Sequence, residues 1–221
     1  MPRRSRYTLQ ERLGHDVFRG VRWVPKGMRA EAALRRIEPG RTIADPKRLL
    51  FAHRNLVHTI DVMQAPSGAR FVLAEYLEGC SLEALGPLPS PLDSHVALEV
   101  CRALAVAKDE GLIHGALTAR SVLVTTRGDV KVTGLGLQPG ASHGDDVAAV
   151  KRLFGVTGAD TAAELGDALV QHMFTHRIRN SDRDLAALVK PRERTTTPVD
   201  SEIAAEAQDL TSLVLEDVTV G

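Results

Sequence analysis

The stretch from Gly111 to Leu137 constrains the fold of this chain more than any other part of the sequence. It contains two short runs rich in β-branched residues, 121–125 and 130–133, on either side of a turn at Arg127-Gly128-Asp129. Two such runs around a glycine-containing turn predict a β-hairpin. His114 precedes the hairpin on a short loop, and a Gly134-Leu135-Gly136 break follows it. The stretch is therefore predicted to be a loop, a hairpin and a glycine break.

This layout resembles the catalytic loop, the hairpin and the magnesium-binding motif of a eukaryotic-type protein kinase, the group that includes the bacterial serine/threonine kinases. The family pattern is H-R-D-L-x-x-x-N followed by D-F-G. His114, Leu117 and Gly136 keep the frame of that pattern. The resemblance implies an α+β, protein kinase-like fold with two lobes: a small β-rich N-terminal lobe and a shortened helical C-terminal lobe.

The positions that would carry the chemistry of a kinase have been replaced. In the family, one Asp accepts the substrate proton, an Asn holds a magnesium ion, and a second Asp holds magnesium against the phosphates. The matching residues are Ala116, Ser121 and Gly134. Ala and Gly have no side-chain oxygen, and a neutral hydroxyl is a weak ligand for a hard cation. The resemblance therefore implies a chain that does not catalyse phosphoryl transfer.

The segment 7–22 resembles the first two kinase strands with their glycine-rich turn. Gly14 keeps the first glycine of the motif, and Val21 keeps its valine. Asp16 and Arg19 occupy the second and third glycine positions, where they place charge and bulk close to where phosphates would lie. We expect Arg19 to be a solvent-facing charge of the hairpin.

Arg35 stands where the V-A-I-K strand of the family has its lysine. Arginine keeps the positive charge, but its planar fork is not interchangeable with an ammonium group. The family next has a helix whose Glu pairs with that lysine, whereas residues 39–52 contain two prolines and a glycine. Two alternatives remain for this region: an ion pair between Arg35 and Asp45, or two independent surface charges.

An adenine slot is implied by five positions. In the family, apolar side chains sandwich the adenine ring, and the backbone of the hinge between the lobes meets its edge. The matching residues are Val21, Ala33, Glu75, Leu77 and Leu123. The alternative is that the apolar members simply fill the core. Because the phosphate and magnesium contacts are lost, we expect weak or absent ATP binding, no magnesium and no other cofactor.

Three further features flank the stretch from Gly111 to Leu137. A helix is predicted from Asp93 or Ser94 to about Glu110, ending at Gly111. Asp146 resembles the helix-start Asp that binds the backbone of the catalytic loop, so with Gly14, His114 and Gly136 it is expected to be structural. Only residues 137–143 stand where a kinase has its long activation segment, and they leave no platform for a peptide substrate.

The resemblance divides the chain into three parts. Residues 1–6 form a basic extension, and residues 7–190 form the kinase-like domain, with lobes at about 7–77 and 78–190. Residues 191–221 form a polar and acidic tail, expected to be either a partner-binding amphipathic helix or disordered. Thr195–Thr197 follow two arginines and would suit a basophilic kinase, although linker threonines commonly have no such role.

Composition excludes several classes of function. The 28 basic and 28 acidic side chains give zero formal net charge, which provides no general attraction to nucleic acid or to an anionic membrane. No apolar run is long enough to span a bilayer, so we expect a soluble cytoplasmic protein. Only two cysteines occur, without a partner at metal-ligand spacing, so no metal site is predicted.

The preserved frame and the deleted chemistry together indicate a pseudokinase. Its expected role is that of a regulatory or scaffolding module that binds a protein partner, such as an active kinase or an assembly. One alternative is an active phosphotransferase with relocated acids, using Asp129, Asp145 or Asp146. Another is a small-molecule binder that uses the vacated nucleotide cleft.

Overall fold

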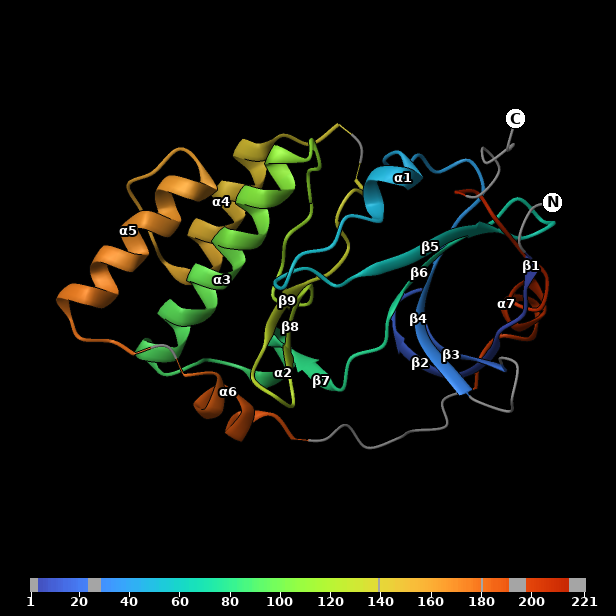
Figure 1. Ribbon diagram of the computed structural model, residues 1–221, viewed down its shortest axis with the longest axis horizontal. Coiled ribbons are helices and arrows are strands. Elements are labelled where there is room, and N and C mark those ends of the chain that lie inside the picture. The colour runs from blue at the N-terminus through green and yellow to red at the C-terminus, as the bar shows by residue number, and fades with distance from the viewer. Residues whose placement is uncertain (1–3, 24–28, 139, 180, 191–197, 215–221) are drawn as a thin grey trace, which may run out of the picture.

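The computed structural model describes residues 4–23, 29–138, 140–179, 181–190 and 198–214. It has two lobes, a β-sheet lobe and a mostly helical lobe, joined through residues 76–78 (Figure 1). Thr195–Thr197 lie outside the described residues. No helix of the described chain is both long enough and apolar enough to cross a membrane.

The N-terminal lobe is built on a seven-stranded antiparallel sheet with the strand order β1-β10-β5-β6-β4-β3-β2. Its strands are β1 (Arg4–Ser5), β2 (Thr8–Gly14), β3 (Val17–Trp23), β4 (Arg29–Ile37), β5 (Thr59–Gln64), β6 (Arg70–Glu75) and β10 (Leu210–Ser212). Only Arg6 and Tyr7 separate β1 from β2, which are the two ends of this order. Two residues span only about 7 Å. The sheet must therefore curl until its edges nearly meet.

The turn between β2 and β3 is tighter than the glycine-rich loop of the family. Gly14 pairs with Val17, so only His15 and Asp16 connect the strands. Asp16 has a φ of 54°, a left-handed conformation that Asp tolerates better than most residues. The pairing with β4 then places Arg19 opposite Ala33, and Val21 opposite Glu31.

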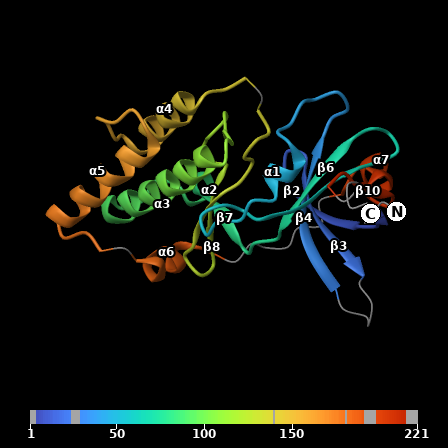
Figure 2. The same ribbon diagram turned by 45° about the horizontal axis from the view of Figure 1, so that its top comes forward.

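The end of the described chain returns to the N-terminal lobe. After α7 (Ser201–Glu206), β10 inserts between β1 and β5, and Figures 1 and 2 both show α7 beside this sheet. Leu210 is fully buried, within an apolar cluster that includes Leu34 and Phe71. The sequence placed 191–221 outside the kinase-like domain, whereas the structure packs this returning segment, residues 198–214, against the N-terminal lobe and adds its strand β10 to the sheet.

An ion pair fastens this returning segment. Nε of Arg36 on β4 donates to Oε2 of Glu206 at 2.6 Å, and Ser67 donates its hydroxyl to Oε1 of the same carboxylate at 2.6 Å. The hydrogen bond from Arg36 holds the pKa of Glu206 below its ordinary value. Nearby, the backbone N–H of Tyr7 donates to the carbonyl of Ala207. The segment is thus held by side-chain and backbone bonds as well as by apolar packing.

The C-terminal lobe is organised around one long helix. The helices of this lobe are α2 (Leu82–Leu85), α3 (Ser90–Asp109), α4 (His143–Phe154), α5 (Ala162–Thr175) and α6 (Asp182–Leu188). Its three-stranded sheet has the order β7-β8-β9, with β7 (Gly79–Ser81), β8 (Val122–Thr125) and β9 (Val130–Val132). The helix α3 packs against α4 and α5 and also against β9, so it is buried on several sides. It begins three residues earlier than Asp93, because Pro91 suits a first helical turn.

The helix that a kinase places beside its sheet is reduced to one turn here. This helix, α1, covers only Pro46–Leu49, and the Asp45 carboxylate caps it by accepting from the N–H of Lys47. Pro46 can open a helix but cannot stand inside one, so the chain before it remains irregular.

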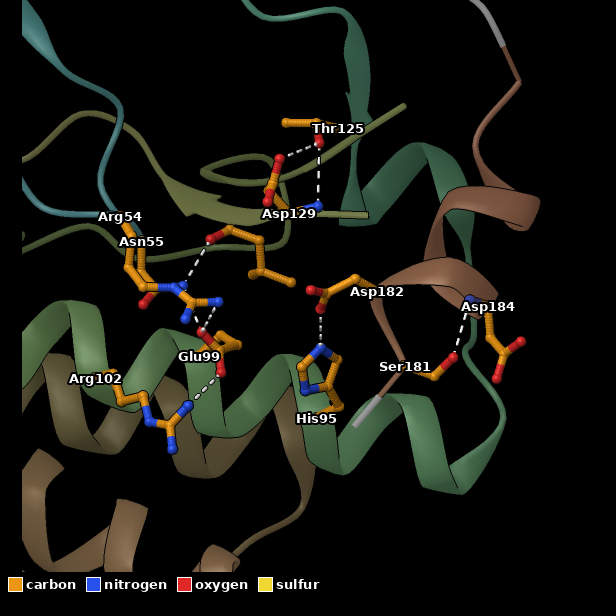
Figure 3. Close-up of polar contacts among 11 residues, drawn as sticks. Arg54, Asn55, His95, Glu99, Arg102, Thr125, Asp129, Ser181, Asp182 and Asp184 are labelled. Carbon is orange, nitrogen blue, oxygen red and sulfur yellow. Dashed lines mark hydrogen bonds and ion pairs between the residues drawn. The ribbon is translucent and has the colours of Figure 1, made fainter. Parts of the chain in front are cut away.

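Buried polar contacts join α3 to the rest of the molecule (Figure 3). The Glu99 carboxylate accepts from Nδ2 of Asn55 at 2.6 Å and from Arg102 at 2.5 Å. Nδ2 of Asn55 also donates to the carbonyl of Val130, which ties the turn before β5 to both α3 and β9. One turn earlier, Nε2 of His95 lies 3.0 Å from an oxygen of Asp182, which anchors α6.

We predict that the returning segment is needed for the stability of the N-terminal lobe. Leu210→Ala should lower the free energy of unfolding by about 2–5 kcal/mol, since it removes a fully buried side chain. Leu188→Ala is the matched control: Leu188 is 40% exposed and should cost less than about 1 kcal/mol. Urea denaturation of the two variants measures the difference. Equal losses would show that β10 is not part of the cooperative fold.

Candidate functional site

Both ring nitrogens of His114 make hydrogen bonds that hold its loop in place. Nε2 of His114 lies 2.9 Å from the carbonyl oxygen of Thr133, and the N–H of Ala116 donates to Nδ1 at 3.2 Å. Nδ1 must therefore accept while Nε2 donates, which fixes one neutral tautomer. Burial lowers the pKa of His114, which favours the same neutral form.

A buried carboxylate fixes the backbone of this loop. Asp146, in the first turn of α4, accepts from the N–H of His114 at 2.9 Å and from that of Gly115 at 2.8 Å. The neighbouring Asp145 serves a different purpose, because it forms a capping box with Ser142 at the start of α4. Asp146 therefore makes the contact that the resemblance implies, and Asp145 stabilises a helix end.

Of the three degenerate positions, Ala116 and Ser121 lie in the loop before β8, and Gly134 follows β9. Ala116 is exposed and carries no polar side-chain atom. Ser121 donates its hydroxyl to the carbonyl of Thr118 and accepts from the N–H of the same residue, both at 2.9 Å. Its hydroxyl is therefore already engaged within the loop. Gly134, with a φ of 89°, lines a cavity between the lobes.

Gly136 stands where the chain passes close to α1. A Cβ atom at this position would lie 2.6 Å from Cδ2 of Leu49 and 2.9 Å from Cβ of Ala44. Its φ of 71° is also a conformation that favours glycine. Its N–H donates to Ile113, and its carbonyl accepts from Ala44. This glycine therefore joins α1 to the loop of His114, whereas a Cβ at Gly14 would meet open space.

The inter-lobe cavity has a volume of about 680 Å³, which is within the range of small-molecule sites. Of the five adenine-slot positions, Ala33, Glu75, Leu77 and Leu123 line it. Val21 is buried but does not line it, and Val17 takes part instead. The two-residue turn explains this difference, because it brings Val17 to the rim and sets Val21 opposite Glu31.

Arg35 points its charge toward this cavity from β4. It is half-buried and lines the cavity. Within the described residues its side chain makes no hydrogen bond and no ion pair, and Asp45 caps α1 instead of pairing with it. Of the two alternatives from the sequence, the ion pair is therefore wrong. The two charges are independent, with Asp45 exposed and Arg35 half-buried at the cavity. Burial lowers its pKa, and the charge of Asp16 partly opposes that effect.

On the hinge side of the cavity, the charge of the Glu75 carboxylate is already paired. Oε1 of Glu75 accepts from Nζ of Lys131 at 2.8 Å and from the N–H of His58 at 3.0 Å. Burial raises the pKa of Glu75, but these two hydrogen bonds outweigh it and hold the pKa below its ordinary value. The carboxylate therefore remains charged and paired.

Arg19 lies inside the sheet lobe and not in solvent. Its side chain is only 8% exposed, with Nε 3.6 Å from Glu11 and Nη1 3.8 Å from Glu31. Its guanidinium also stacks over Tyr76 of the hinge, 5.7 Å from the ring centre. The expectation of a solvent-facing charge was wrong because the register places Arg19 opposite Ala33, toward the hinge. The sequence matched Tyr76 to the hinge but did not predict its contact with Arg19, although an arginine and an aromatic residue form a common stacking pair.

The described part of the chain holds no cluster of three or more His, Cys, Asp or Glu side chains placed to bind a metal ion. At the positions where the family holds magnesium, Gly134 has no side-chain oxygen and the Ser121 hydroxyl donates to the carbonyl of Thr118.

Comparison with known proteins identifies the architecture. Residues 47–154 match the family described as protein tyrosine and serine/threonine kinase. A probable serine/threonine-protein kinase of Clostridium perfringens is 32% identical over 87 residues, which are 38% of this chain and 13% of that protein. The human TBC domain-containing protein kinase-like protein is 29% identical over 139 residues, which are 61% of this chain and 14% of that protein. The chain is a protein kinase-like protein.

The match covers only part of this kinase-like protein. It runs from α1 to the end of α4 and so includes His114, Gly134 and Asp146. The strands β2–β4, which carry Arg35, and the returning segment 198–214 lie outside it. These parts share with the family the two-lobed α+β architecture, a β-sheet lobe with a shorter helical lobe. The kinase-like chain spans only 13% and 14% of the length of those two relatives.

We predict that the unpaired charge of Arg35 contributes to the neutrality of His114. Burial lowers the pKa of His114 in the folded chain. As the pH falls, His114 is therefore protonated in the unfolded chain before it is protonated in the folded chain. The contribution of neutral His114 to the stability of the folded chain is therefore complete above about pH 6.5, the ordinary pKa of histidine. It is lost as the pH falls towards the pKa of His114 in the folded chain. Arg35→Met should raise the pKa of His114 in an NMR titration. Arg127→Met, an exposed control, should leave it unchanged. A wild-type pKa at or above 6.5 would contradict the burial argument.

Proposed function

We propose that this chain is a catalytically inactive pseudokinase of the cytoplasm. It acts as a regulatory or scaffolding module that binds a protein partner, such as an active kinase or an assembly. It binds ATP weakly or not at all and holds no magnesium. The observation that carries the proposal is the combination of a kinase-like loop, held in place by Asp146, with no catalytic side chain at Ala116, Ser121 or Gly134.

The acids that could replace the lost groups are occupied elsewhere. Asp146 holds two backbone amides, and Asp145 caps α4. Asp129 accepts a hydrogen bond from the hydroxyl of Thr125 within the turn between β8 and β9. None of these three is among the described residues that line the cavity. This arrangement supports the inactive reading over the alternative of a phosphotransferase with relocated acids.

The short connection after Gly136 supports the same reading. The helix α4 begins at His143, so residues 137–142 are all that separates it from the glycine. In an active kinase the segment at this place is ordered through phosphorylation and holds the peptide substrate. A connection of this length leaves no such platform, which favours a role in binding over one in turnover.

We predict no phosphotransfer. Purified chain incubated with radiolabelled ATP and either magnesium or manganese should label neither itself nor a generic protein substrate, because no side chain positions the metal or the hydroxyl nucleophile. An authentic serine/threonine kinase assayed in parallel is the positive control. Transfer that disappears in Asp129→Asn or Asp145→Asn would establish the active alternative instead.

We also predict that ATP does not stabilise the chain through magnesium. A thermal-shift titration should show no rise in Tm on adding ATP with magnesium beyond that with ATP and EDTA. Ligand binding raises Tm only when the folded state binds it, so a magnesium-dependent rise would reveal a metal site. That result would contradict the proposal that the chain does not bind magnesium, whatever the phosphotransfer assay shows.

The partner role needs its own experiment. The tagged full chain, expressed at its native level, should co-purify with a protein in a constant molar ratio. Truncation after Lys190 is a poor comparison here, because it would remove β10 from the N-terminal sheet. A full chain that migrates alone, at the mass of one copy and without a bound protein, would contradict a scaffolding role.

A further inference from the structure

The walls of the inter-lobe cavity are mainly apolar. Aliphatic side chains come from the sheet lobe, from the hinge and from the loop after β9. An aromatic side chain comes from the chain after α1. The side chains that matter most for this character are Leu13, Val17, Phe51, Val72, Leu77 and Leu137. Such walls favour the burial of an apolar ligand body, at roughly 25 cal/mol per Å² of apolar surface.

The charges that line the cavity do not cancel. Glu75 is paired with Lys131 at 2.8 Å, and Glu83 with Arg120 at 2.7 Å. Arg35 and Lys190 also line the cavity, and neither makes an ion pair within the described residues. Lys190 is exposed and well solvated, whereas Arg35 is half-buried. The uncompensated charge inside the cavity is therefore positive and belongs chiefly to Arg35.

An unpaired charge taken partly out of water is unfavourable, and an incoming anion relieves that cost. Space for such a group exists next to Arg35. A Cβ atom placed on Gly134 would lie 4.0 Å from Nη2 of Arg35 and 3.8 Å from Nε2 of His114, with no closer neighbour. Because Gly134 has no side chain, this space is open toward the guanidinium. A planar guanidinium can bind one acidic group through two parallel hydrogen bonds.

The surroundings favour one acidic group over several. No carboxylate stands at Ala116, Ser121 or Gly134 to hold a divalent cation that would neutralise a polyphosphate. The charge of Asp16 also acts on Arg35 and would repel additional negative charge. Nε2 of His114 already donates to Thr133, so it adds no second cationic anchor.

We propose that the inter-lobe cavity binds an amphipathic organic anion, without any metal, through Arg35. The ligand would carry an alkyl or aryl body against the apolar walls and a single acidic group, a carboxylate, sulfonate or phosphate monoester, on the guanidinium beside Gly134. The proposal goes beyond the pseudokinase role and is independent of it, because an inactive chain need not bind such a ligand and a binder need not lack activity.

A pair of fluorescent probes with nearly the same body tests the role of the charge. Anilinonaphthalene sulfonate carries one sulfonate, and phenylnaphthylamine is uncharged. In the presence of EDTA, the sulfonate should bind the full-length chain with one-to-one stoichiometry. Arg35→Met should weaken it at least about tenfold, the value of a lost charge-assisted contact. The uncharged probe should bind both proteins alike.

Two further variants sharpen the test. Asp16→Asn should tighten sulfonate binding roughly two- to fivefold, because it removes the charge that opposes an anion at Arg35. Arg127→Met removes an exposed arginine outside the cavity and should change nothing. Arg35→Met should also fold with an unchanged or higher Tm, since it removes a desolvated charge, so a loss of binding cannot be ascribed to unfolding.

Competition distinguishes the natural sources of the acidic group. Decanoate and decyl phosphate should each displace the sulfonate probe, and the one that displaces it at the lower concentration identifies a carboxylate or a phosphate ester as the preferred class. Decanol should be much weaker than either. Equal sulfonate affinity in wild type and Arg35→Met, binding at several sites, or displacement only by ATP with magnesium would each overturn the proposal. None of these results depends on the phosphotransfer assay.

Discussion

The carboxylate of Asp146 is the constraint on which the central part of the molecule depends. It is 3% exposed and accepts two backbone hydrogen bonds, from His114 and Gly115. Without it, two amide donors of an irregular loop would lose their partner in a buried region, at a cost of about 1–3 kcal/mol each. The loop in turn presents His114 to Thr133 and, through Ile113, binds Gly136. A contact between α4 and one loop thus positions His114 behind Thr133 and Gly134, which line the inter-lobe cavity.

The parts of the structure that could be predicted from the sequence are those with local signals. The β-branched runs around Gly128 predicted the hairpin of β8 and β9, and the apolar spacing predicted α3 to within a few residues. The kinase-like architecture followed from several motifs in the right order, and the family match over residues 47–154 agrees with it. Local chemistry decides such elements, since a turn or a helix needs few distant partners.

The features that could not be predicted depend on pairings between distant residues. The position of Val21 and the burial of Arg19 follow from the register of β3 on β4. That register is set by a turn in which only His15 and Asp16 connect β2 to β3. The strand β10 has three residues, and its partners lie about 150 and 200 positions earlier in the chain. A mixed acidic and apolar segment gives no sign of such partners, because strand formation depends on them more than on intrinsic propensity.

The returning segment changes what the cavity can do. The C-terminal lobe is joined to the N-terminal lobe through residues 76–78 and again by the chain between Lys190 and α7, and Lys190 itself lines the cavity. A lobe tied at both ends has less freedom to separate from its neighbour than a lobe tied at one end. Catalytic turnover needs repeated opening to exchange nucleotide, whereas ligand binding gains from walls that are already in place, because less freedom is lost on association. This connectivity is therefore consistent with the binding role proposed for the cavity.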